Sequence, residues 1–140
     1  MLGRADFYVL PASEDRIHFA CRLVEKAYKM GNSVWLRVDE QAIAAIDESL
    51  WTFKPESFVP HAAYNPAAQL TDCPVWLVTH LLPDGQCDLL VNLASQPLEP
   101  STNAGRVAEL VTQQADVLQL TRHQYARYKA LEWTINTHKL

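Results

Sequence analysis

Short apolar runs along the chain predict a set of β-strands. Runs at 6–10, 33–38, 75–82 and 88–93 have the length and the apolar content of strands, and a weaker run at 106–111 predicts a fifth. The run at 75–82 is continuous rather than alternating, which is typical of a strand covered on both faces of a parallel sheet.

Apolar residues recur every three or four positions in three other segments, which predict helices. The first begins at Ser13, a capping hydroxyl followed by two acids, and ends at Gly31 and Asn32, which suit a left-handed C-terminal position. The second follows Asp39, its expected cap, and covers 40–51. The third extends from Ala115 to about Trp133, and its buried side is expected to carry Val117, Leu120, Tyr128 and Leu131.

The order of these elements predicts the fold class. Strand, helix, strand, helix, then further strands and a long helix indicate a mostly parallel sheet with helices on both faces. This is a Rossmann-like α/β sandwich of three layers. At 140 residues, the chain has the usual size of one domain spanning 1–140.

Composition indicates the compartment and the kind of partner. The three cysteines are odd in number and widely spaced, which favours free thiols in a reducing cytoplasm, and neither a signal peptide nor a long apolar span is evident. The net charge is −4, but the segment from Val117 onward contains four basic residues and only one acidic residue, Glu132. An acidic protein with one basic patch suits a small anionic target, such as an acidic peptide, better than a long nucleic acid.

The residues that would support enzymatic chemistry are not arranged for it. The first strand–helix turn, "LPASEDR", has no glycine and carries two acids, and no GxGxxG or GxxxxGK[ST] occurs, so no nucleotide or other cofactor is expected. Cys73, His80 and Cys87 lack the spacing of a metal site. No nucleophile stands near a base and an orienting group, so no catalytic residue is assigned and a non-enzymatic protein is expected.

The segment "WTFKPESFVPH", 51–61, is rich in aromatic residues for a loop. Trp51 and Phe53 either cover the end of the sheet or face a partner, and both readings stay open. Phe58-Val59-Pro60 is too short for a core strand, and an aromatic residue on a stiffened loop is typical of an interface anchor.

The last predicted helix carries a second candidate surface. Arg122, Tyr125 and Lys129 lie at steps of three and four and form one stripe. The helix is either an ordinary solvated amphipathic helix or a basic, aromatic-lined site for an acidic chain end.

The chain resembles the chi subunit of bacterial DNA polymerase III over nearly its whole length. The motifs that carry the resemblance are "FYVL" (7–10), "DESLWTFKPESFVPH" (47–61), "RYKA" (127–130) and "INT" (135–137). It implies a Rossmann-type domain without nucleotide or enzymatic activity, in the cytoplasm at replication forks. It also implies a heterodimer with the psi subunit, which connects chi to the clamp loader, and binding to the acidic C-terminal tail of the single-stranded DNA-binding protein. DNA itself would be contacted only indirectly.

The resemblance also assigns residues to the two partners. The psi-binding residues would be Trp51, Phe58, Val59 and Pro60, with Phe58 as the anchor. The tail-binding residues would be Arg122, Tyr125, Arg127, Tyr128, Lys129 and Thr137. The family has basic residues three and seven positions before the tyrosine matched by Tyr128, where this chain has Tyr125 and Thr121. Either the tail site is repositioned, with charge from Arg122 and Arg127, or its affinity is lower; we favour the first.

Two alternatives remain. One is a small nucleotide- or metabolite-binding α/β enzyme, for which the turn at 10–16 is decisive. The other is direct single-stranded DNA binding by the C-terminal helix.

Overall fold

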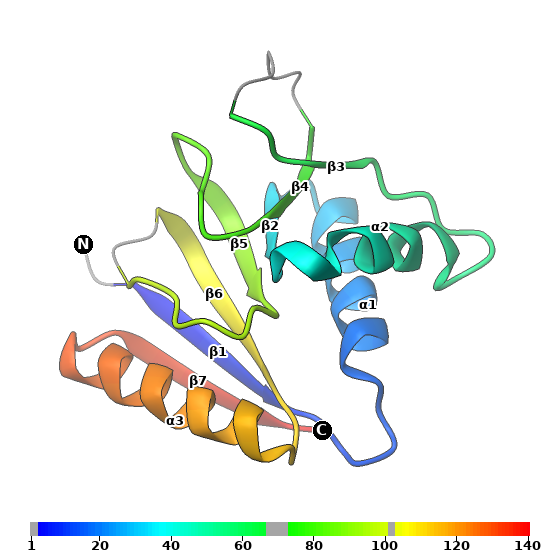
Figure 1. Ribbon diagram of the computed structural model, residues 1–140. Helices are drawn as coiled ribbons and strands as arrows, with labels where there is room; N and C mark the ends of the chain where they lie inside the picture. The colour runs from blue at the N-terminus through cyan, green and yellow to red at the C-terminus, as the bar shows by residue number, and fades with distance from the viewer. Residues whose placement is uncertain (1–2, 67–72, 101–102) are drawn as a thin grey trace.

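The described residues, 3–66, 73–100 and 103–140 of this computed structural model, form one sheet of seven strands with three α-helices (Figure 1). The strands are β1 (Arg4–Val9), β2 (Val34–Arg37), β3 (His61–Ala63), β4 (Val75–Val78), β5 (Cys87–Asn92), β6 (Ala104–Val111) and β7 (Thr134–Lys139). The helices are α1 (Arg16–Lys29), α2 (Ile43–Thr52) and α3 (Ala115–Ala130), with a 3₁₀ turn, η1 (Glu40–Ala42), directly before α2. The strand order is β3-β4-β2-β5-β6-β1-β7, and all neighbouring pairs are parallel.

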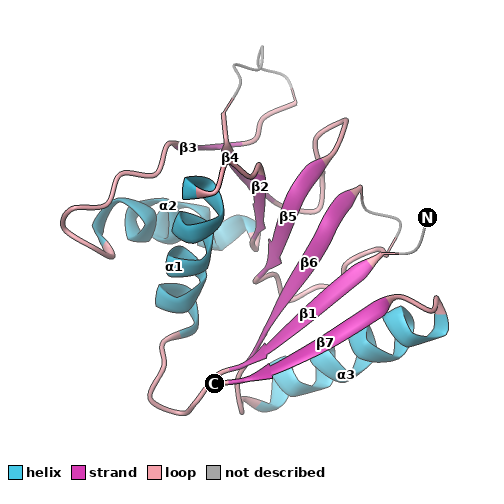
Figure 2. Cartoon of the chain, turned by 180° about the vertical axis from the view of Figure 1, so that it is seen from behind, coloured by secondary structure: helices cyan, strands magenta, loops and turns pink. Residues whose placement is uncertain are grey.

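Helices cover both faces of this sheet, which confirms the predicted Rossmann-like three-layer sandwich. One apolar core lies between the sheet and α1 with α2, and it contains Val24, Leu50 and Leu89. The other lies under α3, around Phe7, Leu90 and Tyr128. Seen from behind, α3 lies alongside β7 at one end of the sheet, and β3 with α2 lies toward the other end (Figure 2).

Side chains along β1 and β7 alternate between these two faces, as the pleat requires. Phe7 on β1 and Ile135 on β7 face α3. Tyr8 and His138 face the opposite side, where their rings stack with centroids 4.8 Å apart. The register pairs Phe7 with Thr137, so Thr137 lies on the α3 side beside Phe7.

The predicted start of the first helix is wrong by two residues, whereas its end is confirmed. Asp15 rather than Ser13 is the N-cap, and its Oδ1 accepts a hydrogen bond from His18 N at 2.8 Å. Ser13 lies in a turn in which Glu14 N donates to Pro11 O at 3.0 Å. At the other end, Gly31 has φ of 83°, the left-handed conformation expected of the residue after a C-cap.

The expected cap at Asp39 is also wrong. Asp39 precedes η1 but makes no capping bond, because its Oδ1 accepts hydrogen bonds from Ser95 N at 2.9 Å and Ser95 Oγ at 3.1 Å. Asp39 therefore ties the end of β2 to the loop after β5, and α2 begins only at Ile43.

The end of the chain differs most from the sequence prediction. The third helix ends at Ala130 rather than near Trp133, and Leu131, expected on its buried side, is 48% exposed. Glu132, with φ of 59°, reverses the chain into β7. Neither β7 nor β3 was predicted, because both strands are short or polar and lack an apolar run.

Candidate functional site

Exposed aromatic side chains lie at the end of α2 and on the loop that follows it. Phe58 is 68% exposed and Trp51 is 43% exposed, with ring centroids 5.5 Å apart. Pro60 is half-buried beside them. We refer to Trp51, Phe58 and Pro60 as the aromatic surface, which lies next to the edge strand β3.

The loop that carries the aromatic surface is anchored by buried and half-buried residues on its inner side. Val59, predicted as a surface residue that supports Phe58, is instead only 1% exposed and belongs to the core under α1 and α2. The His61 imidazole lies under Trp51, with centroids 4.2 Å apart, and its Nδ1 contacts Val59 O at 2.7 Å. Its Nε2 lies 3.1 Å from Asp47 Oδ1 on α2. Because Val59 is buried and the His61 ring is held in place, the backbone of this loop is preorganised. The Phe58 side chain is therefore directed outward from a fixed position.

A buried carboxylate attaches the same loop to α1. Glu25 Oε2 accepts a hydrogen bond from Ser57 Oγ, and Lys54 Nζ lies 3.5 Å from Glu25 Oε1. The Ser57 hydrogen bond, aided by the positive charges of Lys29 and Lys54, holds the pKa of Glu25 below its ordinary value even though burial opposes this. Phe53 packs against the α1–α2 core, which answers the open question for that residue.

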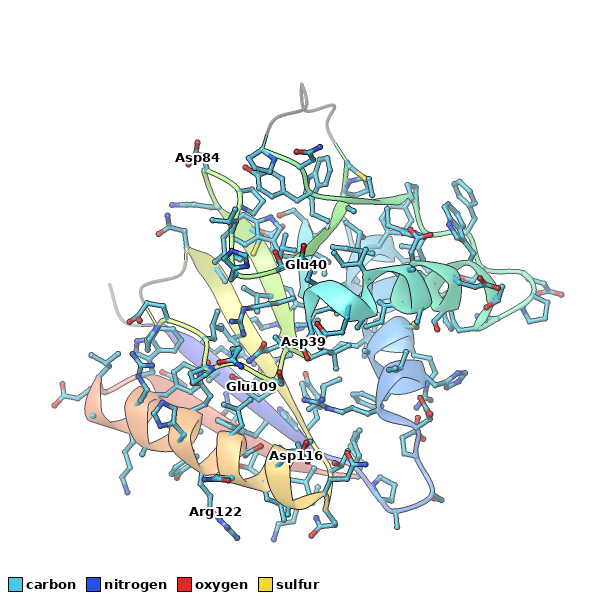
Figure 3. All side chains as sticks on the ribbon, viewed as in Figure 1. Asp39, Glu40, Asp84, Glu109, Asp116 and Arg122 are labelled. Carbon is cyan, nitrogen blue, oxygen red and sulfur yellow. The ribbon has the colours of Figure 1, made fainter. Side chains whose placement is uncertain are left out.

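A second set of exposed residues lies on the flank of α3 beside β7. Arg122, Tyr125 and Lys129 are exposed on one side of the helix, as their spacing predicts. The Tyr125 ring is 5.6 Å from that of Phe7, and the register places Thr137 beside Phe7. We refer to Arg122, Tyr125, Lys129 and Thr137 as the α3–β7 surface. Figure 3 shows the Arg122 side chain directed away from the sheet.

Arg127 and Tyr128 do not belong to this surface. Arg127 projects from the opposite flank of α3 and makes a 3.0 Å ion pair with Glu99, in the loop between β5 and β6. Tyr128 is fully buried, stacked on Trp133 with centroids 4.7 Å apart. The structure therefore brings together four of the six predicted tail-binding residues and separates the other two.

The Tyr128 hydroxyl is part of a buried polar cluster that the sequence analysis missed. It donates to Glu109 Oε2 at 2.7 Å, and Asn92 Nδ2 donates to Glu109 Oε1 at 3.0 Å. Gln124 Nε2 donates to the Tyr128 hydroxyl at 3.1 Å, and Arg37 donates to Asn92 Oδ1 at 3.0 Å. The sequence signal was present, because Asn92 and Glu109 are polar residues inside otherwise apolar strands.

Burial sets the protonation behaviour of this cluster. Desolvation raises the pKa of Glu109 above its ordinary value, and the hydrogen bonds from Tyr128 and Asn92 only partly oppose it. Desolvation, with the neighbouring Glu109 carboxylate, also raises the pKa of Tyr128. Glu109 lies between β6 and α3 (Figure 3), and both of its oxygens are occupied, so the cluster fixes α3 on the sheet.

The position at which Rossmann-like folds bind phosphates is also present, with a different lining. A cavity of about 600 Å³ lies at the carboxyl ends of β1 and β6, and Glu14, Asp15 and Arg16 are among its lining residues. The Asp15 carboxylate already caps α1, and Arg16 Nε donates to Leu110 O at 3.1 Å. The positive end of α1 is therefore satisfied by a carboxylate of the chain itself.

Three further observations concern the cysteines, metal binding and membrane-spanning helices. Cys21, Cys73 and Cys87 are free thiols, and burial raises the pKa of Cys21 to about 11 and that of Cys87 to about 12. In the described ranges, no three His, Cys, Asp or Glu side chains lie close enough together to hold a metal ion. No helix in the same part of the chain is long and apolar enough to span a membrane.

The sheet order and the two helical layers define a Rossmann-like α/β protein. The family model described as DNA polymerase III chi subunit, HolC, matches residues 2–136. The chain therefore belongs to the DNA polymerase III chi subunit family.

Three relatives named DNA polymerase III subunit chi support this assignment. The one from Pseudomonas aeruginosa is 35% identical over 142 aligned positions, which cover 99% of this chain and 98% of the relative. The one from Haemophilus influenzae is 27% identical, covering 98% and 97%. The one from Escherichia coli is 26% identical, covering 84% and 80%.

Proposed function

We propose that this chain is a non-enzymatic adaptor of the polymerase III clamp loader. The aromatic surface binds the psi subunit, and the α3–β7 surface binds the acidic C-terminal tail of the single-stranded DNA-binding protein. The observation that carries the proposal is the contrast between Phe58, two-thirds exposed, and the adjacent Val59, which is buried. An exposed aromatic ring on a fixed backbone loses little conformational entropy on binding, which is the property of an interface anchor.

The α3–β7 surface has the charge expected for an acidic chain end. Arg122 and Lys129 are exposed on both sides of Tyr125 along the helix, in a chain whose net charge is −4. The Tyr125 ring supplies an apolar contact between the two charges. Tyr128, fully buried, supports this site by holding α3 in place rather than by touching the peptide.

The two surfaces lie at opposite edges of the sheet, one beside β3 and one beside β7. At about 4.8 Å between strands, six intervals separate them by about 29 Å. Both partners can therefore bind at once, and salt should weaken only the tail contact, because exposed charge pairs are screened and apolar contacts are not.

A binding experiment with both partners tests the proposal. Purified protein would be titrated with psi and, separately, with a labelled peptide of the acidic tail, at low and high salt. We expect both to bind, simultaneously, with only the peptide affinity falling as salt rises. A labelled oligonucleotide and a nucleotide thermal-shift screen cover the two alternatives, and tighter oligonucleotide binding or stabilisation by a nucleotide would contradict the adaptor function.

A further inference from the structure

The outer edge of β7 carries unpaired backbone groups. β7 is the last strand of the sheet and pairs only with β1 in the described part of the chain. Thr134 N donates to Gly3 O at 3.0 Å, and Leu140 N donates to Val9 O at 3.1 Å. In a parallel ladder, alternate residues direct both N–H and C=O toward the same neighbour. Ile135, Thr137 and Lys139 therefore direct their backbone N–H and C=O groups outward.

This edge lacks most of the features by which proteins protect edge strands. Such strands are usually very short, bulged, covered, or interrupted by proline. β3, at the opposite edge, is three residues long, whereas β7 has six residues and no proline. Lys139 is its single charged residue and lies at its last position. A strand of this length offers a continuous template for an extended chain.

The same edge is adjacent to the basic flank of α3. Thr137 is exposed and lies on the α3 side beside Phe7, whose ring contacts Tyr125. Figures 1 and 2 both show α3 running alongside β7. Among the described residues, Arg122, Lys129 and Lys139 make no ion pair with an acid, so their charges remain available to a ligand.

We propose that the acidic tail binds by adding a strand to the outer edge of β7, with alternate side chains directed at the α3–β7 surface. This inference rests on the proposed function and names how that site recognises its ligand. Backbone pairing would supply sequence-independent affinity, and Arg122, Lys129 and Lys139 would select acidic side chains or the terminal carboxylate. A peptide fits the edge better than single-stranded DNA, because a phosphodiester backbone has no donor for the outward carbonyl groups.

Backbone-modified peptides test the proposal on the unaltered protein. Three peptides of identical sequence would be compared: unmodified, N-methylated at alternate residues, and N-methylated at the intervening residues. Only one set of amides in an added strand faces β7. We expect one methylated peptide to bind at least about tenfold more weakly, since each hydrogen bond contributes about fivefold, and the other to keep its affinity within about threefold.

Amide hydrogen exchange measured on the protein tests the strand-addition proposal independently. The amides of Ile135, Thr137 and Lys139 should gain protection when the unmodified peptide binds. Those of Asn136 and His138, which face β1, should be protected with or without it. Equal effects of the two methylated peptides, or unchanged exchange at the three outward amides, would overturn the proposal.

Two substitutions at Thr137 distinguish the contribution of the backbone N–H to peptide affinity from that of the side chain. Thr137→Pro removes an outward N–H that β1 does not use, so the fold is retained while peptide affinity falls by about fivefold or more. Thr137→Val removes only the side-chain hydroxyl and keeps the backbone N–H, so it should bind the peptide at least about fivefold more tightly than Thr137→Pro does. If the peptide binds and Arg122→Ala weakens it but neither methylation nor Thr137→Pro does, strand addition is wrong and the tail site stands. If the unmodified peptide does not bind, both proposals fail.

Discussion

Truncation of Phe58 should separate partner binding from stability. The side chain is 68% exposed, and its nearest ring, Trp51, is 5.5 Å away between centroids. Phe58→Ala removes little area that folding buries, so the free energy of unfolding should fall by less than about 1 kcal/mol. At the psi interface the same ring would act as the anchor, for which truncation typically costs about 2–4 kcal/mol, or roughly 30- to 1,000-fold in affinity.

The neighbouring residue is a matched control with the opposite expected result. Val59 is 1% exposed, and Val59→Ala removes two buried methyl groups, which should cost about 2 kcal/mol of stability. Folded Val59→Ala protein should still bind psi well. The assays are chemical denaturation of the free chain and calorimetric titration with psi. If Phe58→Ala destabilises the free chain as much as Val59→Ala does, or leaves psi affinity unchanged, the anchor assignment is refuted.

Three further predictions concern α3. Arg122→Ala should weaken the tail peptide about fivefold at low salt, whereas Arg127→Ala, on the opposite flank, should not; equal effects in fluorescence anisotropy would argue against the α3–β7 surface. Tyr128→Phe removes a donor to buried Glu109 and should cost about 1–3 kcal/mol in urea denaturation. The pKa of Glu109 is raised by burial above 4.5, so the native state retains its proton longer and stability should fall as pH rises from 4.5 through the folded-state pKa. Glu109→Gln should abolish that fall, and an unchanged pH profile would contradict it.

The parts of the fold that a local pattern specifies were predictable. The apolar runs in β4 and in the middle of β5 made these buried parallel strands recognisable, and the spacing in α1 indicated its inward stripe. β7 was not predictable in the same way. Its sequence, TINTHK, has one apolar residue, and it is a strand because β1 offers a ladder, which is a tertiary effect.

In the candidate site too, local spacing predicted some features, whereas tertiary packing determined the others. Spacing alone placed Arg122, Tyr125 and Lys129 on one side of α3, and the prolines around Phe58 indicated a stiff loop. Whether a residue faces inward depends on what packs against it, so Val59 was assigned to a surface although it is buried. The helical spacing placed Tyr128 on the buried side of α3, which is confirmed, whereas the resemblance assigned it to the tail site. Arg127 was assigned by its proximity in sequence, and its partner, Glu99, lies 28 residues away.

The placement of the two surfaces at opposite edges of the sheet has a mechanical consequence. If the proposed partners bind these two surfaces, a pull between them would cross the strands rather than run along them, so the hydrogen-bonded ladders would carry the load in series. The weakest link would be the ladder between β3 and β4, which has three residue pairs. Under tension, the molecule would open first beside the aromatic surface, while the tail remained attached at the far edge.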